Sequence, residues 1–168
     1  MRRYNKNNDR SPTMNYAAAL RVIGQDWERR MLKSFDLKVD GDLYVAECAY
    51  QLPPAPTPVE IQYTQADLRE LEALGEEQRG KSSPAKEFLS QVQILRTIGG
   101  YLDHNRAKLL RVTNNFSSGE EFSLRVEYLN VDGERTVDDR SGAAIYDLCI
   151  AMYKQRKKLT GTGTGRGR

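Results

Sequence analysis

The sequence predicts an α+β protein made of two tandem αβββα repeats, each a three-stranded antiparallel sheet with its helices on one face. Three observations lead to this fold. The motif Leu-Arg-x-Ile-Gly occurs at residues 20–24 and again at 95–99, 75 positions later. After each copy, the apolar positions change from a spacing of three or four to strict alternation, as they do where a helix gives way to strands. The elements that follow the two copies have the same order, which is typical of a duplicated unit.

Length and composition place the chain among globular proteins and predict no membrane partner. The 168 residues are 39% hydrophobic and 29% charged, close to the average for soluble domains. No apolar run approaches the roughly 18 residues that a transmembrane helix requires. The N-terminal residues lack the apolar segment of a secretory signal, and Cys48 and Cys149 lie far apart within apolar patterns. We therefore expect a cytoplasmic protein with small buried cysteines, and a disulfide between the halves is the less favoured alternative.

Positive charge is concentrated at the two ends of the chain. Residues 1–13 carry a net charge of +3 and residues 153–168 carry +6, so residues 14–152 carry −6 within a total of +3. Both ends are poor in the apolar residues that ordered structure needs, and disordered basic tails are predicted at 1–13 and 159–168. The folded part is expected to be acidic.

The first repeat is predicted to cover residues 14–80 and to begin with a helix over 15–31. Asn15 is a suitable N-cap for this helix. Apolar residues recur at helical spacing and form one face: Tyr16, Leu20, Ile23, Trp27 and Met31. Gly24 lies on the same face, where glycine costs about 1 kcal/mol of helix propensity relative to alanine. We therefore expect this helix to approach its neighbour closely at Gly24.

Three strands and a second helix complete the first repeat. The expected elements are strands at 35–39, 43–50 and 59–63, a helix at 65–78 and a linker at 81–84. Asp40-Gly41 predicts a tight hairpin between the first two strands. The proline-rich segment 53–58 cannot join a sheet ladder and is predicted to be a stiff connector. Thr64 is a suitable N-cap for the helix that follows.

The second repeat is predicted over residues 85–158 with the same order of elements. These are a helix at 85–103, strands at 108–113, 122–128 and 134–140, and a helix at 142–157. Gly99 takes the place that Gly24 has in the first repeat, and Ser141 can cap the last helix.

The spacing between equivalent positions varies little along the two repeats. It is 75 at the first helix, 78 at the second strand (Tyr50 to Tyr128) and 77 at the last helix (Leu68 to Ile145). Differences of this size can be accommodated in loops, as a duplicated unit would require.

Residues that catalyse reactions or hold metals form no recognisable constellation. His104 is the single histidine and falls at the predicted end of a helix, where the helix dipole favours it. Cys48 has Glu47 and Tyr50 as neighbours, and not the electropositive setting of a nucleophilic thiol. No Cys/His spacing matches a metal site, and the glycines of residues 161–167 follow no strand and open no helix. We therefore predict a non-enzymatic protein without a metal or other cofactor.

The predicted sheet of the first repeat has an apolar outer face. Leu43, Val45 and Ala49 point outward, whereas the equivalent strand at 122–128 presents polar side chains outward. Because a monomer seldom exposes such a patch, we expect the other repeat or a second chain to cover it. This face is therefore the predicted site of homodimer formation or of binding to a protein partner.

The basic C-terminal residues are a second candidate site. They are Lys154, Arg156, Lys157, Lys158, Arg166 and Arg168. Such a segment can neutralise the phosphates of RNA or DNA without reading their sequence. The other interpretation is a cationic helix end favoured by the dipole, followed by a solubilising tail. Nucleic-acid association is therefore the alternative to a protein-binding or adaptor function.

The order of one helix, three strands and one helix resembles that of double-stranded-RNA-binding domains in topology. The resemblance implies phosphate contacts from lysines at the start of the last helix. The corresponding residues are Gln-Ala-Asp at 65–67 and Gly-Ala-Ala at 142–144, and neither segment contains lysine. The surface by which that family binds RNA is therefore absent from both repeats.

Overall fold

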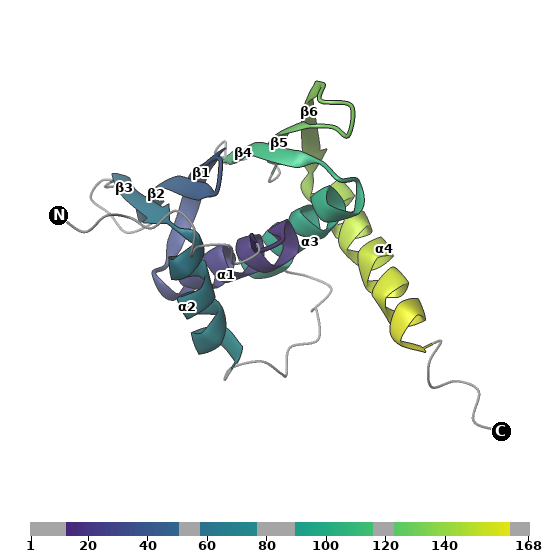
Figure 1. The fold of residues 1–168 in the computed structure, drawn as a ribbon, viewed down its shortest axis with the longest axis horizontal. Coiled ribbons are helices and arrows are strands. Elements are labelled where there is room, and N and C mark those ends of the chain that lie inside the picture. The colour runs from purple at the N-terminus through teal and green to yellow at the C-terminus, as the bar shows by residue number, and fades with distance from the viewer. Residues whose placement is uncertain (1–12, 51–57, 77–89, 116–122, 162–168) are drawn as a thin grey trace, which may run out of the picture.

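The fold has two layers, an antiparallel sheet and a set of helices that all lie on one of its faces (Figure 1). We analysed a computed structural model, which describes residues 13–50, 58–76, 90–115 and 123–161. Within these residues the helices are α1 (Tyr16–Arg29), α2 (Gln65–Glu76), α3 (Gln91–His104) and α4 (Gly142–Gly161). The strands are β1 (Leu32–Asp40), β2 (Leu43–Tyr50), β3 (Pro58–Tyr63), β4 (Lys108–Asn115), β5 (Ser123–Leu129) and β6 (Arg135–Ser141). The predicted α+β class is confirmed.

All six described strands belong to one sheet, in the order β3-β2-β1-β4-β5-β6, and every neighbouring pair is antiparallel. Each half contributes three strands, as predicted, but the two sets are not separate sheets, because β1 pairs with β4. At the centre of this pair Leu37 lies opposite Val112, and both side chains are fully buried. The pairing leaves neither half with an exposed edge at β1 or β4, which is a physical reason for the merger.

The closest contact between the two halves is the crossing of α1 and α3. Gly24 and Gly99 are both buried there. A Cβ atom added to Gly99 would lie 2.7 Å from the Cα of Ala17, and one added to Gly24 would lie 3.1 Å from the Cα of Val92. The expected close approach at Gly24 is therefore confirmed, and the neighbour of each glycine is the backbone at the start of the opposite helix.

Each of these two helices also caps the other. The carboxylate of Asp103, near the end of α3, accepts hydrogen bonds from the backbone N–H groups of Tyr16 (3.0 Å) and Ala17 (2.9 Å). Glu28, near the end of α1, accepts a longer bond of 3.4 Å from the N–H of Val92. These N–H groups have no partner within their own helix, so the bonds satisfy donors that would otherwise need water. They also require α1 and α3 to run antiparallel.

Short polar side chains define where the helices begin. The side chain of Asn15 accepts from the N–H of Ala18 at 2.9 Å, which confirms it as the N-cap of α1. Thr64 and Ser141 accept equivalent bonds from the N–H groups three residues further on, as predicted. The predicted start of the third helix at Ala85 is wrong. Ser90 forms a capping box with Gln93 and has an extended backbone, so the described helix begins after it.

The end of α1 also differs from its prediction. The helix stops at Arg29, and Met31 has a φ of 57° and a side chain that is 69% exposed. Met31 was predicted to lie on the apolar face. That prediction is wrong because the chain has already left the helix in the left-handed conformation that turns it into β1. The other residues of that face pack well: Leu20, Ile23 and Trp27 are fully buried, and the Trp27 ring lies 4.5 Å from that of Phe35.

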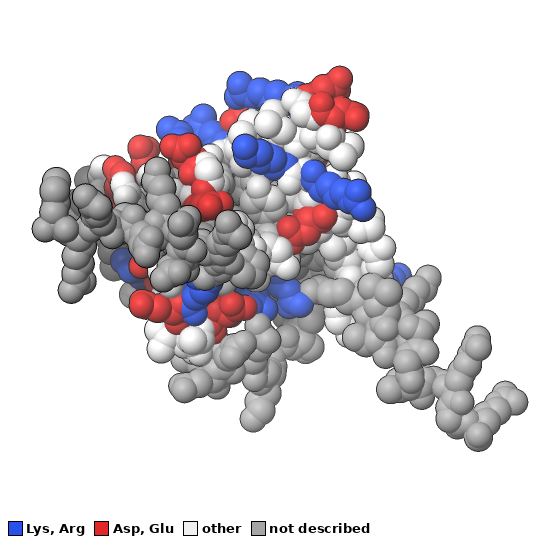
Figure 2. All heavy atoms as spheres, viewed as in Figure 1, with Lys and Arg blue, Asp and Glu red and all other residues white. Residues whose placement is uncertain are grey.

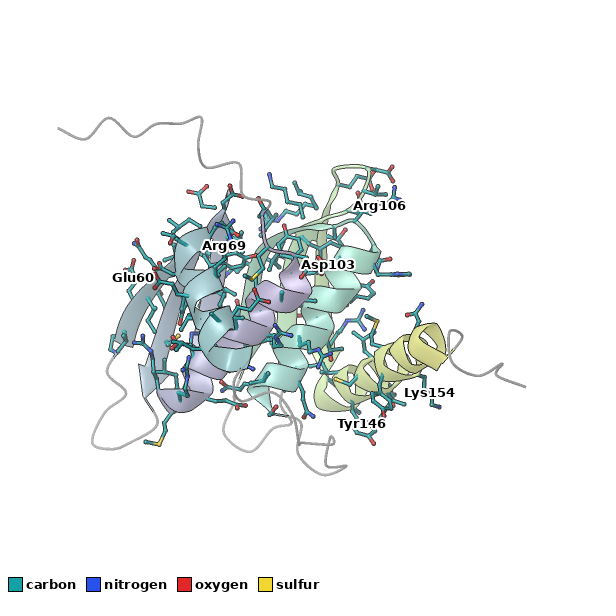
Figure 3. All side chains as sticks on the ribbon, turned by 60° about the horizontal axis from the view of Figure 1, so that its bottom comes forward. Glu60, Arg69, Asp103, Arg106, Tyr146 and Lys154 are labelled. Carbon is teal, nitrogen blue, oxygen red and sulfur yellow. The ribbon has the colours of Figure 1, made fainter. Side chains whose placement is uncertain are left out.

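Helix α4 continues further than the sequence predicts. It runs to Gly161, so the predicted start of a disordered tail at residue 159 is too early. Ile145 is its one fully buried side chain among those described, whereas Tyr153 and Lys154 are exposed. In Figure 3, Lys154 lies toward the far end of α4, away from the sheet. The linker at 81–84, most of the connector at 53–58 and most of both tails lie outside the described residues. No helix in the described ranges is both long and apolar enough to span a bilayer.

The helix crossing predicts that alanine substitutions at two neighbouring glycines differ in their effect on stability. Gly99→Ala places a methyl group against the backbone of Tyr16 and Ala17, which can yield only if the helices separate. We expect it to lower the free energy of unfolding by about 3 kcal/mol, the upper part of the usual range for overpacking. Gly100→Ala meets only the terminal methyl of Met152 and gains roughly 1 kcal/mol of helix propensity, so its stability should change little.

Urea denaturation followed by circular dichroism measures both variants. Equal stability of the two would contradict a backbone-to-backbone contact at Gly99.

Candidate functional site

The sheet has a second face, which points away from the helices and which we call the outer face. Buried residues such as Leu37, Tyr44, Ala46 and Val126 point toward the helices, so alternate residues point outward. The outer face comprises Asp36, Lys38, Asp40, Leu43, Val45, Glu47, Ala49, Glu60, Gln62, Lys108, Arg111, Thr113, Arg125, Glu127, Leu129, Arg135, Val137 and Asp139. No described helix lies on this side of the sheet (Figure 1).

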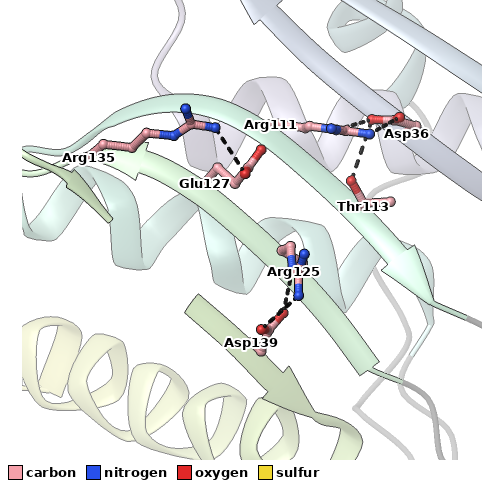
Figure 4. Close-up of polar contacts among 7 residues, drawn as sticks. All are labelled: Asp36, Arg111, Thr113, Arg125, Glu127, Arg135 and Asp139. Atoms are coloured by element: carbon pink, nitrogen blue, oxygen red, sulfur yellow. Dashed lines mark hydrogen bonds and ion pairs between the residues drawn. The ribbon is translucent and has the colours of Figure 1, made fainter. Parts of the chain in front are cut away.

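The centre of the outer face is an ion pair between the two halves (Figure 4). Arg111 of β4 donates two hydrogen bonds to the carboxylate of Asp36 of β1, and the one from Nε measures 2.8 Å. Thr113 lies opposite Asp36 in the β1–β4 ladder, and its hydroxyl is 3.5 Å from the same carboxylate. A bidentate arginine–carboxylate pair has a fixed geometry, so it helps to hold the register at the junction of the halves.

Two further ion pairs lie on β5 and β6 (Figure 4). Arg125 binds Asp139 through two bonds of 2.8 and 3.2 Å, and Arg135 binds Glu127 at 3.2 Å. The hydrogen bond from Arg125 lowers the pKa of Asp139, so this carboxylate is charged at neutral pH. The side chains of Arg125 and Asp139 are 59% and 60% exposed. Exposed pairs of this kind contribute little to folding stability.

The predicted partner surface lies on β2 of the outer face. Leu43, Val45 and Ala49 alternate with the buried side chains of that strand and are themselves half-buried. Lys38 and Gln62 flank Val45 in the neighbouring strands, which is why the patch is less exposed than expected. The expectation that the other half covers this patch is wrong for the described residues, because that half continues the sheet sideways.

Charge is unevenly distributed over the outer face. On β1 to β3 the carboxylates of Asp40, Glu47 and Glu60 face solvent with a single lysine, Lys38. On β4 to β6 the cations are Lys108, Arg111, Arg125 and Arg135, and the anions are Glu127 and Asp139. In Figure 2, several acidic side chains lie at the left near β2 and β3, basic ones lie along the top near β4 and β5, and a further acidic group lies at the top right near β6. The face is therefore acidic in its first half and basic in its second.

On the other side of the sheet lies a buried polar cluster that was not predicted from the sequence. Asp26 of α1 is 5% exposed, accepts a hydrogen bond of 2.6 Å from the hydroxyl of Tyr63, and lies 3.1 Å from Arg30. Burial of the ring, and then this bond, raise the pKa of Tyr63. The signal was present in the sequence, since Asp26 occupies a core position of α1 next to Trp27. Its partners secure the edge strand β3 to the helix layer.

The structure shows the setting of the two cysteines and of the single histidine. Cys48 is buried beside this cluster, and burial raises the pKa of its thiol to about 12. His104 is the last residue of α3 and is exposed, as predicted for a helix C-terminal residue. Neither cysteine forms a disulfide, and Cys149 is only half-buried, with its sulfur 2.9 Å from the hydroxyl of Thr97. In the described part of the chain, no three His, Cys, Asp or Glu residues could hold a metal ion.

The structure places some of the predicted phosphate-binding residues on α4. Lys154 is exposed on this helix. Arg156, Lys157 and Lys158 belong to its last turns, while residues 166 and 168 lie outside the described residues. The structure does not bring these positions together with the outer face.

Cys48 should be inert toward alkylation in the folded protein. A thiol reacts as its thiolate, and a pKa near 12 leaves almost none of it at pH 8. In a Cys149→Ser background we expect iodoacetamide to label Cys48 only after unfolding in urea, as measured by mass spectrometry. Rapid labelling of the native protein at pH 8 would show that this region opens readily or that the thiol is activated.

Comparison of the chain with models of protein families, with curated proteins and with solved structures finds no match in any of the three.

Proposed function

We propose that this protein is a non-enzymatic binding module that engages a protein partner through the outer face of its sheet. One observation carries the proposal. The described helices all lie on the opposite side, and the outer face combines half-buried aliphatic residues such as Val45 with exposed, ion-paired charges. This mixture of apolar and charged side chains is typical of surfaces that bind proteins reversibly.

A protein suits the outer face better than a nucleic acid does. Each of its three arginines has a carboxylate partner within the face: Arg111 with Asp36, Arg125 with Asp139, and Arg135 with Glu127. Phosphates would have to compete with these carboxylates. Proteins that bind single strands on a sheet also present aromatic rings on which bases stack. The outer face as defined above has no aromatic residue.

The non-enzymatic character is part of the proposal. Its support is the setting of the two side chains most suited to catalysis. Burial raises the pKa of Cys48, so its thiol stays protonated and unreactive. His104 lies exposed at the end of α3.

We further propose that the two halves, residues 14–80 and 85–158, are copies of one αβββα unit. Two contacts and one backbone conformation recur at a spacing of 75 residues and support this origin. Gly24 and Gly99 each approach the start of the opposite helix, Glu28 and Asp103 each cap it, and Met31 and Arg106 both have positive φ. At the second strand the ladders pair Leu37 with Ala46 and Val112 with Val126, so the spacing there is 80 and not the predicted 78.

Helix α4 favours a second candidate function, association with nucleic acid through the basic end of the chain. The helix continues to Gly161, well past Ile145, and Lys154 on it is exposed. A cationic helix that extends beyond the core can contact phosphates without disturbing the fold.

A valine-to-glutamate pair tests the binding face. Val45→Glu places a charge at the centre of the aliphatic part of the outer face, next to Lys38, and should reduce partner binding at least tenfold. Val131→Glu makes the same change at a 66% exposed valine in the turn after β5 and should have no effect. The measurement is affinity capture from native extract with quantification by mass spectrometry. Equal capture by both variants would contradict the assignment of this face.

Removal of residues 154–168 tests the second candidate. The truncation deletes six lysine and arginine residues but keeps Ile145 and Met152, which pack against the body. If this end contacts phosphates, affinity for a generic nucleic acid should fall, and so should the slope of log affinity against log salt concentration. Fluorescence anisotropy over a salt series measures both. Binding that is absent in the full chain, or unchanged by the truncation, counts against this function.

A further inference from the structure

We propose that the partner of the outer face is a second copy of this chain, packed face to face so that the first half of each copy covers the second half of the other. The inference deepens the proposed function and depends on it. It commits to one occupant because the outer face is complementary in charge to itself.

The two halves of the outer face carry net charges of opposite sign. Asp40, Glu47 and Glu60 make the outward side of β1 to β3 acidic, whereas Lys108, Arg125 and Arg135 give that of β4 to β6 an excess of positive charge. A surface that is acidic at one end and basic at the other attracts its own copy when the two are placed in opposite directions.

A two-fold rotation places the acidic half of one copy against the basic half of the other. A two-fold axis parallel to the strands, running between β1 and β4 just above the outer face, turns a second sheet over and exchanges its halves. Strand β5 of one copy then lies over β2 of the other, and β6 lies over β3. Such a contact uses the same patch on both copies, so it closes as a dimer.

The cross-strand register shows which side chains would meet. Glu47 pairs with Asp36, Asp36 with Thr113, and Thr113 with Arg125, so these four residues share one level of the sheet. The two-fold axis preserves this level and places Glu47 of one copy over Arg125 of the other. Arg125 is 59% exposed even with Asp139 bound to it, so it can reach a second carboxylate. The Asp36–Arg111 pair remains within each copy, next to the axis.

The outer face is large enough to form a specific interface. Six strands spaced about 4.8 Å apart, over about 20 Å of strand length, present a plane on the order of 600 Å². Two such faces bury about 1,200 Å² or more, which exceeds the roughly 1,000 Å² expected of a specific interface. Two sheets commonly pack face to face in this way, about 10 Å apart and with strand directions within about 30° of each other. The half-buried Val45 and Leu43 and the exposed Val137 would lie within the contact.

Charge reversal in two variants, one in each half, tests the proposal. The first-half variant is Glu47→Arg and the second-half variant is Arg125→Glu, because these are the two residues that the two-fold axis places against each other. Either variant alone places like charges against each other in its own dimer, so we expect dimerisation to weaken about 100-fold or more. Mixed together, the two variants present opposite charges at both ends of the contact, and we expect a dimer that contains one chain of each. Sedimentation velocity on full-length chains, with thermal melts to confirm folding, measures these outcomes.

Each possible result of this experiment either supports or overturns the proposed dimer. A wild-type dimer that is lost in each variant and recovered in the mixture supports the proposal. A wild-type chain that stays monomeric at concentrations on the order of 100 μM overturns it, and so does a dimer that resists both reversals or folded variants that fail to recover on mixing. The binding function is judged separately, since capture of a different protein that Val45→Glu abolishes would keep the outer face as a binding site with another occupant.

Milder variants keep the test decisive if a reversal fails to fold. Glu47→Gln and Arg125→Gln remove one charge each without introducing a repulsive one, and each should weaken the dimer about tenfold. Sodium chloride at 1 M, where the screening length is about 3 Å, should weaken the wild-type dimer and leave a neutralised variant nearly unchanged. A dimer indifferent to salt and to both substitutions would overturn the proposal.

Discussion

The contact on which the rest of the structure depends is the antiparallel crossing of α1 and α3. Gly24 and Gly99 let the two backbones approach so closely that a methyl group at either position would press against the opposite backbone. Glu28 and Asp103 each cap the start of the opposite helix. Each half alone would bury little apolar surface, because small domains keep much of their surface in water. The crossing joins the two helix layers at the same place where β1 and β4 join the two sets of strands, so one core of about double the size results.

This arrangement is also the reason why we propose the outer face as the binding surface. Because all the described helices lie on one side, the other side of a wide sheet is left to polar and half-buried side chains. Its arginines are held by carboxylates of the same face, notably Arg111 by Asp36 across the junction of the halves. The result is a rigid surface with its charges already oriented. Preorganised surfaces of this kind lose little conformational freedom on binding, which favours a protein partner of matching charge.

Much of the local structure could be predicted from the sequence, since the signals are short-range. Asn15, Thr64 and Ser141 cap helices as expected, and alternation along β2 correctly separated the buried Tyr44 from the outward Val45. The start of α3 was missed because helical spacing continues upstream of Ser90, and only the backbone conformation shows that the helix begins there. On the outer face, the outward aliphatic residues of β2 were identified from the sequence, but the ion pairs on β1, β4, β5 and β6 were not.

The sequence by itself determined the fold class, the order of elements, the caps at Asn15, Thr64 and Ser141, and the residues that alternate between the two sides of each strand. These depend on backbone preferences and on spacings of two to four residues, which can be read along the chain. Only the tertiary structure decided that six strands form one sheet, that Asp36 meets Arg111, and that Asp103 caps α1. These contacts join residues about 75 or more positions apart, and their partners are selected by how the two halves pack, which no local pattern encodes.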